Sequence, residues 1–273
     1  MNTVLERNEL LETKIITDYG LVSIIMPNYN SAKFIKDTID SVVAQTYQNW
    51  ELLFVDDCST DKSLEIVRSF EDERIRIFQN DINSGAAVSR NYALREARGK
   101  WIAFLDSDDL WENKKLEKQL EYMVSNNYDF TYTRYVQIDD ESNPMGREIT
   151  GPQKIGRHKM FQYDYIGCLT VIYNAEKTGV IQIEPSLKNR NDYAIWLKVC
   201  KFCECHLLDE RLARYRIRKK SLSHSGIKNK IKGQYRLYRY GENMCVLMAG
   251  WHTIVNMFFG VLKKVFYTKT TNK

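Results

Sequence analysis

Residues 101–109, Trp-Ile-Ala-Phe-Leu-Asp-Ser-Asp-Asp, join five apolar side chains directly to a group of three carboxylates. The apolar half is typical of a buried strand, and the acidic half follows where that strand ends. Carboxylates this close repel one another, so a cation or a set of N–H donors must compensate them. Mg²⁺ or Mn²⁺ suits that task, because both take oxygen ligands and often bridge to phosphate oxygens. The stretch therefore indicates a metal–diphosphate site at the end of a strand.

A local role for these acidic residues is the simpler alternative. Asp and Ser are favoured helix N-caps, and an acidic first turn suits the helix dipole. A helical pattern does follow, at residues 112–125. One of the three carboxylates could cap that helix, so the meaning of the cluster depends on its surroundings.

The stretch is the fourth strand of a regular alternation that starts at Leu21. Strands separated by helices of 10–15 residues form a mostly parallel, Rossmann-like sheet with helices on its faces. Ligands of such sheets bind beyond the carboxyl ends of the strands, where Asn28, Asp57 and Asp106 should meet. We predict strands at residues 22–26, 51–55, 74–78 and 101–105, and helices at residues 31–45, 61–70 and 85–97.

The pattern changes after Asp109 and predicts a mixed sheet that completes the same domain. We expect a strand at residues 128–138, a loop rich in Gly and Pro at 139–159, a strand at 166–173, a helix at 191–201 and a strand at 211–217. The chain then divides into an N-terminal arm (1–20), a main domain (21–225, with halves 21–109 and 110–225) and a helical tail (226–273).

The tail joins a basic stretch to an apolar one. Lysines and arginines recur between Lys228 and Arg239, and residues 244–266 are strongly apolar. A polar stripe at three- to four-residue spacing is typical of a helix that lies on a membrane surface. Packing on the domain or on a partner subunit is the main alternative, and a spanning helix is less favoured. The stripe consists of His252, Thr253, Asn256, Gly260, Lys263 and Lys264.

Composition sets wider limits. The chain has 273 residues, enough for one large or two small domains, and its net charge of +5 is concentrated between Arg211 and Arg239. Such a patch can meet nucleic acid, anionic lipid or a phosphorylated substrate, but no nucleic-acid motif accompanies it, so we expect no nucleic-acid partner. Six scattered cysteines and an N-terminus without an apolar signal segment indicate a cytoplasmic protein with reduced thiols. The Cys200–His206 stretch lacks the second ligand pair of a structural zinc site, so buried thiols are favoured there.

Four motifs together resemble one protein family. Residues 22–30 (Val-Ser-Ile-Ile-Met-Pro-Asn-Tyr-Asn), 54–61 (Phe-Val-Asp-Asp-Cys-Ser-Thr-Asp), 89–91 (Ser-Arg-Asn) and 104–109 occur in the order and spacing of the family 2 glycosyltransferases. The similarity runs from about Leu21 to about Ser223. It implies the nucleotide-diphospho-sugar-transferase (GT-A) fold and an inverting mechanism.

The resemblance implies roles in binding the donor nucleotide. Pro27 and Tyr29 would line the pyrimidine pocket, with the Tyr29 ring stacked on the base. Asp57 would accept a hydrogen bond from a base N–H. Arg90 would reach the base or the diphosphate.

The resemblance also implies the metal and diphosphate ligands. Asp106 and Asp108 would form a D-x-D pair around Ser107, with Asp106 near the ribose and metal and Asp108 a direct metal ligand. The metal would stabilise the leaving nucleoside diphosphate. Arg218, with the serines at 221 and 223, would close over the diphosphate, a role that guanidinium and hydroxyl donors suit.

The general base of the family is usually an Asp in a Glu-Asp pair that opens a helix. Asp192 occupies that position here, and Asn191 replaces the usual Glu. The base would take the acceptor proton as the hydroxyl attacks C1 of the sugar. An N-cap for the helix that follows is the alternative role of Asp192.

The function implied is metal-dependent transfer of a hexose or N-acetylhexosamine from a nucleotide diphosphate sugar, a UDP-sugar above all, to a hydroxyl of a glycan or polyprenyl-diphosphate-linked sugar. Cell-surface polysaccharide synthesis at the cytoplasmic face of the membrane is the natural setting by family analogy, and a homodimer is compatible with the sequence. One alternative is a binding module that has lost catalysis, which only Asn191 favours. A nucleotidyltransferase is disfavoured, because residues 27–31 contain neither Gly nor a basic residue.

Overall fold

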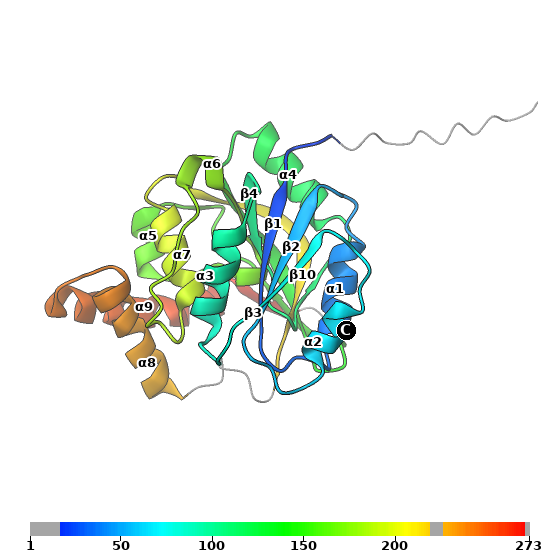
Figure 1. Cartoon of the computed structure of the whole chain (residues 1–273). Helices are drawn as coiled ribbons and strands as arrows, with labels where there is room; N and C mark the ends of the chain where they lie inside the picture. Colours follow the sequence, from blue (N-terminus) through cyan, green and yellow to red (C-terminus); the bar gives the residue numbers. More distant parts are fainter. Residues whose placement is uncertain (1–16, 219–225, 271–273) are drawn as a thin grey trace, which may run out of the picture.

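A central sheet separates two layers of helices in the computed structural model, which describes residues 17–218 and 226–270 (Figure 1). Each face of the sheet has its own hydrophobic core. One face is covered by α1 (Ile35–Val43), α2 (Ser63–Arg68) and α4 (Lys115–Ser125). The other is covered by α3 (Ala86–Glu96), α5 (Arg157–Gln162), α6 (Ala175–Thr178) and α7 (Asn191–Val199).

The strands of the first half are parallel, and those of the second half are mixed. Neighbouring strands follow the order β11-β7-β6-β9-β4-β1-β2-β3, and β10 pairs with β6, β5 and β8. The parallel set is β1 (Val22–Asn28), β2 (Trp50–Asp56), β3 (Ile75–Gln79) and β4 (Trp101–Phe104). The remaining strands are β5 (Leu110–Trp111), β6 (Phe130–Ile138), β7 (Pro144–Ile149), β8 (Lys154–Ile155), β9 (Ile172–Asn174), β10 (Cys205–Arg216) and β11 (Thr268–Thr270). The predicted fold class, parallel first and mixed afterwards, is confirmed.

Unbroken apolar runs explain why the middle strands lie where they do. Every residue of β1, β2 and β4 is buried. Successive side chains point to opposite faces, so Ile24 joins one core and Ile25 the other. Strands covered by helices on both faces need such runs. Their burial fixes the edge at which their carboxyl ends meet.

Three segments differ from the prediction, and one of them is the strand expected at 211–217, which begins as early as Cys205. The stretch at 139–159 was expected to be a loop, but it contains β7 and β8. Pro144 and Gly146, which indicated a loop, lie inside β7, and the charged Glu148 of this strand is buried in a 2.7 Å ion pair with Arg134 of β6. The strand expected at 166–173 begins only at Ile172, because Thr170 bonds back to the Gly167 carbonyl and closes a 3₁₀ turn.

The tail helices lie against the main domain. α8 (Ile227–Arg236) leads through a π-type turn to α9 (Val246–Phe266), and β11 then pairs with β7. Among the described residues, α9 is the one helix long and apolar enough to cross a membrane, judged by length and composition alone. It lies along the domain here, because its residues and the strand that follows it bond to the domain.

The polar stripe of α9 faces the domain except at Lys264, which is exposed. Thr253 and Asn256 are buried, and the Asn256 amide lies 3.5 Å from the Tyr193 hydroxyl and 3.4 Å from that of Tyr238. The opposite side of the helix is an exposed apolar face. This apolar face consists of Leu247, Met248, Trp251, Ile254, Phe258, Val261, Val265 and Phe266.

Candidate active site

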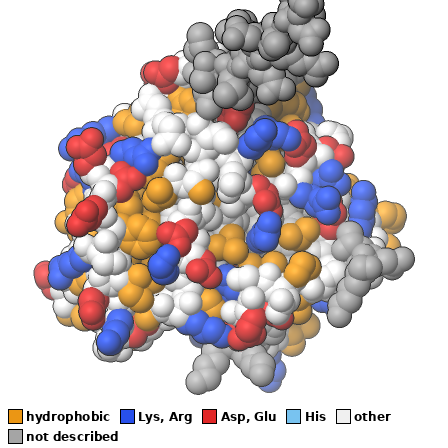
Figure 2. Space-filling model, turned by 90° about the vertical axis from the view of Figure 1, so that its right-hand side faces the viewer, with side chains coloured by type: hydrophobic (Ala, Val, Ile, Leu, Met, Phe, Trp, Pro, Cys, Tyr) orange, Lys and Arg blue, Asp and Glu red, His pale blue; other side chains and the backbone are white. Residues whose placement is uncertain are grey.

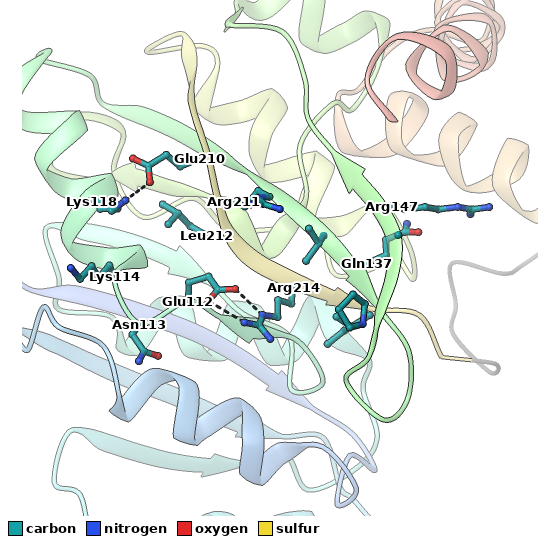
Figure 3. A pocket seen from close by; sticks show the side chains of 14 residues that line it. Glu112, Asn113, Lys114, Lys118, Gln137, Arg147, Glu210, Arg211, Leu212 and Arg214 are labelled. Carbon is teal, nitrogen blue, oxygen red and sulfur yellow. Dashed lines mark hydrogen bonds and ion pairs between the residues drawn. The ribbon is translucent and has the colours of Figure 1, made fainter. Parts of the chain in front are cut away.

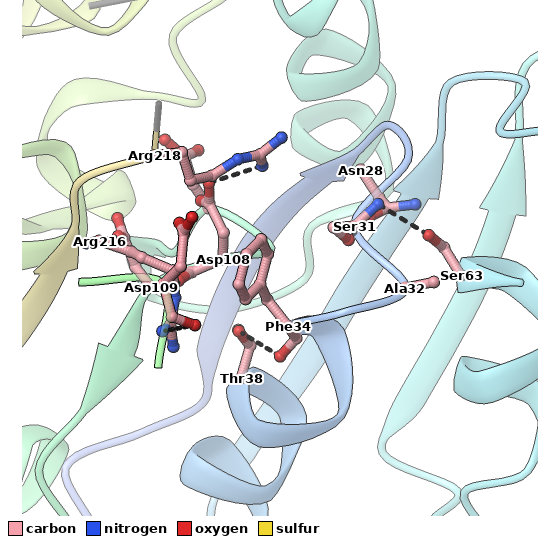
Figure 4. Close-up of polar contacts among 12 residues, drawn as sticks. Asn28, Ser31, Ala32, Phe34, Thr38, Ser63, Asp108, Asp109, Arg216 and Arg218 are labelled. Carbon is pink, nitrogen blue, oxygen red and sulfur yellow. Dashed lines mark hydrogen bonds and ion pairs between the residues drawn. The ribbon is translucent and has the colours of Figure 1, made fainter. Parts of the chain in front are cut away.

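The carboxyl ends of β1 and β2 are fastened to each other by buried polar side chains. Asn28 and Asp56 stand opposite one another in register, and the Asn28 amide donates to the Asp56 carboxylate at 2.8 Å. Asn28 also accepts from the Ser31 hydroxyl, and Figure 4 shows these two residues side by side. Asp56 accepts from the Ser59 backbone N–H at 2.9 Å. These contacts hold the two loops that carry the predicted base-binding residues.

Asp57 binds the loop before α3. Its carboxylate is buried and accepts from the Asn80 amide at 2.8 Å, from the Ser84 N–H at 2.9 Å and from the Gly85 N–H at 2.7 Å. A carboxylate can accept about four hydrogen bonds, so one position remains for a ligand. Gly85 has a φ of +88°, which glycine adopts without steric cost and other residues rarely adopt, and this explains the glycine in this loop.

Pro27 and Tyr29 sit beside this edge in different surroundings. Pro27 is buried within β1, opposite Val55 of β2. Tyr29 is 48% exposed, so part of its side chain is open to a stacking partner.

Arg90 of α3 connects the end of β4 to the start of α7. Its guanidinium is 5% exposed and donates to both the Asp106 carboxylate and the Asn191 side-chain carbonyl. Burial alone would lower the pKa of Arg90, but the charge of Asp106 raises it, so the group remains a cation. Asn191, the departure from the family pattern, is thus a neutral partner for a buried arginine.

The remaining carboxylates of the acidic stretch are held by the last residue of β10, Arg216, and by Arg218, two residues beyond the strand. Asp108 forms a 2.8 Å ion pair with Arg218, and Asp109 accepts from the Arg216 N–H at 2.8 Å. Figure 4 shows these four residues gathered beside the Phe34 ring, over which Arg216 lies at 4.7 Å. Burial, with added repulsion from neighbouring carboxylates, raises the pKa of Asp108 and raises that of Asp109 further.

The donor set fits a divalent cation that shares its ligands with a substrate. Within residues 17–218 and 226–270, no three His, Cys, Asp or Glu side chains converge as a ready-made metal site. Mg²⁺ is commonly held by one or two carboxylates plus substrate phosphates, which is what Asp106 and Asp108 could offer. Ser107 between them is buried. Arg90 is paired with Asp106, and Arg218 with Asp108. A bound metal would therefore have to share these two carboxylates with the two arginines.

Asp192 lies in the first turn of α7 but does not cap the helix. The N-cap is Arg190, and the Asp192 carboxylate accepts from the N–H of the next residue, Tyr193, at 2.8 Å. The alternative role of Asp192 as an N-cap is therefore wrong. Its partly exposed carboxylate keeps acceptor capacity for a proton.

A second charged group beside Asp192 was not anticipated from the sequence. It consists of Asp164, Arg190 and Lys263 of α9. The charges of Arg190, Lys263 and Asp192 shift the pKa of Asp164, and those of Asp164, Arg190 and Asp192 shift the pKa of Lys263. Burial, with the charge of Asp192, raises the pKa of Asp164 to about 7. The only sequence signal for Asp164 is its place as a lone charge between two tyrosines, at 163–165.

Cysteines 200 and 205 are buried, and burial raises the pKa of both thiols. The serines at 221 and 223 that were expected to bind diphosphate lie outside the described residues, as do residues 1–16 of the expected arm.

A large cavity lies elsewhere on the sheet. It has a volume of about 820 Å³ and is bordered by β6, β7 and β10 and by the start of α4 (Figure 3). Its charged lining is largely paired, as in the 2.7 Å ion pair of Glu112 with Arg214. None of the predicted donor ligands lines it.

The face seen in Figure 2 carries acidic and basic side chains side by side. Nucleic-acid binding proteins instead gather one sign of charge into a patch or stripe. This face therefore gives no support to a nucleic-acid partner.

Comparison with known proteins agrees with the geometry. The model of glycosyl transferase family 2 matches residues 23–176. The chain is 40% identical over 234 residues to the putative teichuronic acid biosynthesis glycosyltransferase TuaG of Bacillus subtilis, covering 85% of this chain and 92% of TuaG. It is 44% identical over 184 residues to WfgD of Escherichia coli, named as a UDP-Glc:α-D-GlcNAc-diphosphoundecaprenol β-1,3-glucosyltransferase, covering 67% of this chain and 71% of WfgD.

Solved structures share the fold. Staphylococcus aureus TarS (residues 1–349) with UDP-GlcNAc superposes with a TM-score of 0.69 at 21% identity, covering 90% of this chain and 73% of TarS. The mannosyltransferase PcManGT of Pyrobaculum calidifontis, with GDP-Man and Mn²⁺, gives 0.60 at 15% identity, covering 90% and 76%. With this GT-A fold and the family match, the chain belongs to glycosyltransferase family 2 and is a glycosyltransferase.

Proposed function

We propose that the chain catalyses metal-dependent, inverting transfer of a hexose or N-acetylhexosamine from a UDP-sugar to a hydroxyl of a lipid-linked sugar, in the synthesis of a cell-surface polysaccharide. One observation carries the proposal. The Arg90 guanidinium joins Asp106 of the D-x-D pair to Asn191, the neighbour of Asp192. Asp106, a donor ligand, and Asp192, the candidate base, are 86 residues apart in the sequence. Both nevertheless lie near one buried cation, the Arg90 guanidinium.

Donor binding would use the loops after β1 and β2. The open Tyr29 ring suits stacking on uracil, and the free acceptor position of Asp57 suits the base N–H. Pro27 would form the floor of this pocket. TarS, which shares the fold, binds UDP and UDP-GlcNAc.

Diphosphate binding would use the acidic stretch. Asp106 and Asp108 would hold Mn²⁺ or Mg²⁺, and when bound the ion would stabilise charge on the leaving UDP. Arg218 lies beside Asp108 and could turn its guanidinium to the diphosphate without moving the strand. Ser107, which lies between them in the sequence, is buried.

Acceptor activation would fall to Asp192. Its carboxylate would remove the proton of the acceptor hydroxyl as that oxygen bonds to C1 and the C1–O bond to UDP breaks. Attack from the side opposite UDP inverts the configuration at C1. Asn191 leaves Arg90 with one carboxylate partner, Asp106, instead of two, so no second negative charge opposes the departing diphosphate.

The tail supports a membrane-bound acceptor. Residues 226–273 would place the apolar face of α9 on the inner surface of the cell membrane, as a peripheral attachment. WfgD and WfaP, both from Escherichia coli, are named for an acceptor with a diphosphoundecaprenol anchor. A lipid-linked acceptor would reach a site held at that surface.

The proposal is tested with a panel of nucleotide sugars, with and without Mn²⁺. We expect turnover of a UDP-sugar that depends on the metal, and an Asp108→Asn variant that loses metal-dependent turnover by a factor of ~10² or more at saturating Mn²⁺. Full activity of that variant would refute the ligand role. Binding of the UDP-sugar with no transfer or hydrolysis would favour the binding-module alternative.

A further inference from the structure

We propose that Lys263 of α9 and Arg190 at the start of α7 form a subsite for a phosphate group of the acceptor, beside Asp192. The inference rests on the proposed function and deepens it, because it assigns the tail helix a part in substrate recognition. It also names the chemistry recognised, which is the diphosphate that links the acceptor sugar to its lipid.

Lys263 points toward the domain and away from the apolar face of its helix. Its Nζ donates to the Asp164 carbonyl at 3.1 Å and lies 5.4 Å from the centre of the Tyr163 ring. Gly260, one turn earlier, lets the helix approach Tyr163, since a Cβ there would be 2.8 Å from the ring. An ammonium group has three donors, and one is used in this contact.

Lys263 is half-buried, and removing its ammonium group from water is costly unless an anion lies nearby. Burial lowers the pKa of Lys263 to about 8, although Asp164 and Asp192 act in the other direction. A neighbouring phosphate would favour the charged form and offset the cost of desolvation. A helix that needed only to pack on the domain could carry an apolar side chain here.

Arg190 supplies the second cation. It takes a left-handed conformation, with φ +60° and ψ 22°, that is costly for a residue other than glycine. Such strain persists where the surroundings enforce it, and it tends to mark ligand sites. Among the described residues, its guanidinium has no hydrogen bond or ion pair of its own, so its donors remain available.

Charges around the subsite leave it positive. The groups that act on Lys263 are Asp164, Asp192 and Arg190. With the pKa of Asp164 raised to about 7, its carboxyl is partly protonated near neutral pH. Two basic side chains, Lys263 and Arg190, then act against a partly neutral Asp164 and against Asp192, which would sit at the acceptor hydroxyl.

The position suits a glycosyl diphosphate. Its phosphate is bonded to the same sugar whose hydroxyl meets Asp192, so the two groups must bind close together. α9 turns Lys263 inward, while Trp251 and Phe258 on its other side face outward. A lipid diphosphate could therefore place its phosphates on Lys263 and pass its chain along the apolar face.

The test measures binding of farnesyl diphosphate and of farnesol by titration calorimetry. Saturating UDP and Mn²⁺ fill the donor site first, so that diphosphate cannot bind there. We expect farnesyl diphosphate to bind more tightly than farnesol. Lys263→Gln and Arg190→Gln should each weaken the diphosphate about 10-fold or more, with farnesol unchanged. Lys263→Arg should restore most of the affinity.

Lys264→Gln is the matched control, since Lys264 is the exposed neighbour on the same helix. Equal binding of farnesyl diphosphate and farnesol, or equal losses in the Lys263 and Lys264 variants, would overturn the inference. A loss of binding to phosphatidylglycerol vesicles in the Lys263 variant, with farnesyl diphosphate unaffected, would assign the subsite to lipid headgroups and also overturn it. UDP affinity and donor turnover report separately on the proposed function.

Discussion

Replacing Asp57 by Asn should weaken both the fold and donor binding. The buried carboxylate holds three N–H groups, from Asn80, Ser84 and Gly85, all within 2.9 Å. An amide oxygen could keep the first two, as neutral hydrogen bonds. Its NH₂ group would then face the Gly85 N–H, donor against donor. The loss of one charge-assisted bond and the stranding of a buried donor should cost ~2–4 kcal/mol of unfolding free energy.

Urea unfolding measures this loss directly. At a typical denaturant slope of ~3 kcal/mol per molar, the midpoint should fall by ~1 M. UDP affinity should fall by about 10-fold or more, because the position left for the base N–H belongs to the same carboxylate. Asp81→Asn, at an exposed site in the same loop, is the control and should change neither value. An Asp57→Asn protein within ~0.5 kcal/mol of wild type would refute the assignment of Asp57 as the anchor of this loop.

Three other changes separate catalysis, electrostatics and attachment. Asp192→Asn should lower kcat by ~10²–10⁴ while UDP affinity persists, and wild-type rates in steady-state assays would place the base elsewhere. Asp164→Asn should stabilise the protein at pH 8 and leave it unchanged at pH 4. The pKa of Asp164 in the folded state is raised to about 7, so the folded state disfavours the ionised carboxylate and loses stability as the pH rises through that value. After allowance for its partial exposure, the loss should be ~2 kcal/mol, and Asn avoids it. Urea unfolding at the two pH values checks this, and an identical pH dependence in both proteins would contradict it. Joint replacement of Trp251 and Phe258 by Ser should reduce pelleting with phosphatidylglycerol vesicles and barely move Tm, since both side chains are more than 60% exposed. Undiminished pelleting would rule out the apolar face as the attachment surface.

The parallel half of the fold was predictable because its signals are local. Buried strands such as β1 and β4 are unbroken apolar runs, and each ends at a polar residue that marks the ligand edge. β7 escaped prediction because Pro144 and Gly146 are typical of loops, and because its charged Glu148 finds its partner, Arg134, only on the neighbouring strand. A charge that finds its partner through tertiary pairing looks, in one sequence, like a loop residue.

The site was predictable only as far as its motifs reach. The acidic stretch and Asp192 could be named, but the bond from Arg90 to Asn191 joins residues 101 positions apart. No periodicity connects such a pair. The inward orientation of Lys263 was equally hidden, because a polar stripe on an apolar helix does not reveal whether protein or water lies opposite.

The pairing of β11 with β7 has a consequence for biosynthesis. Residues 268–270 cover one edge of the sheet, and they leave the ribosome only after all of α9. Until then the backbone groups along that side of β7 have no strand beside them, and unpaired edges invite association with other chains. If the nascent α9 helix met a lipid surface early, β11 would be held near β7 and the edge of β7 would be unpaired for less time. Membrane attachment would then accompany completion of the sheet and reduce the chance of aggregation.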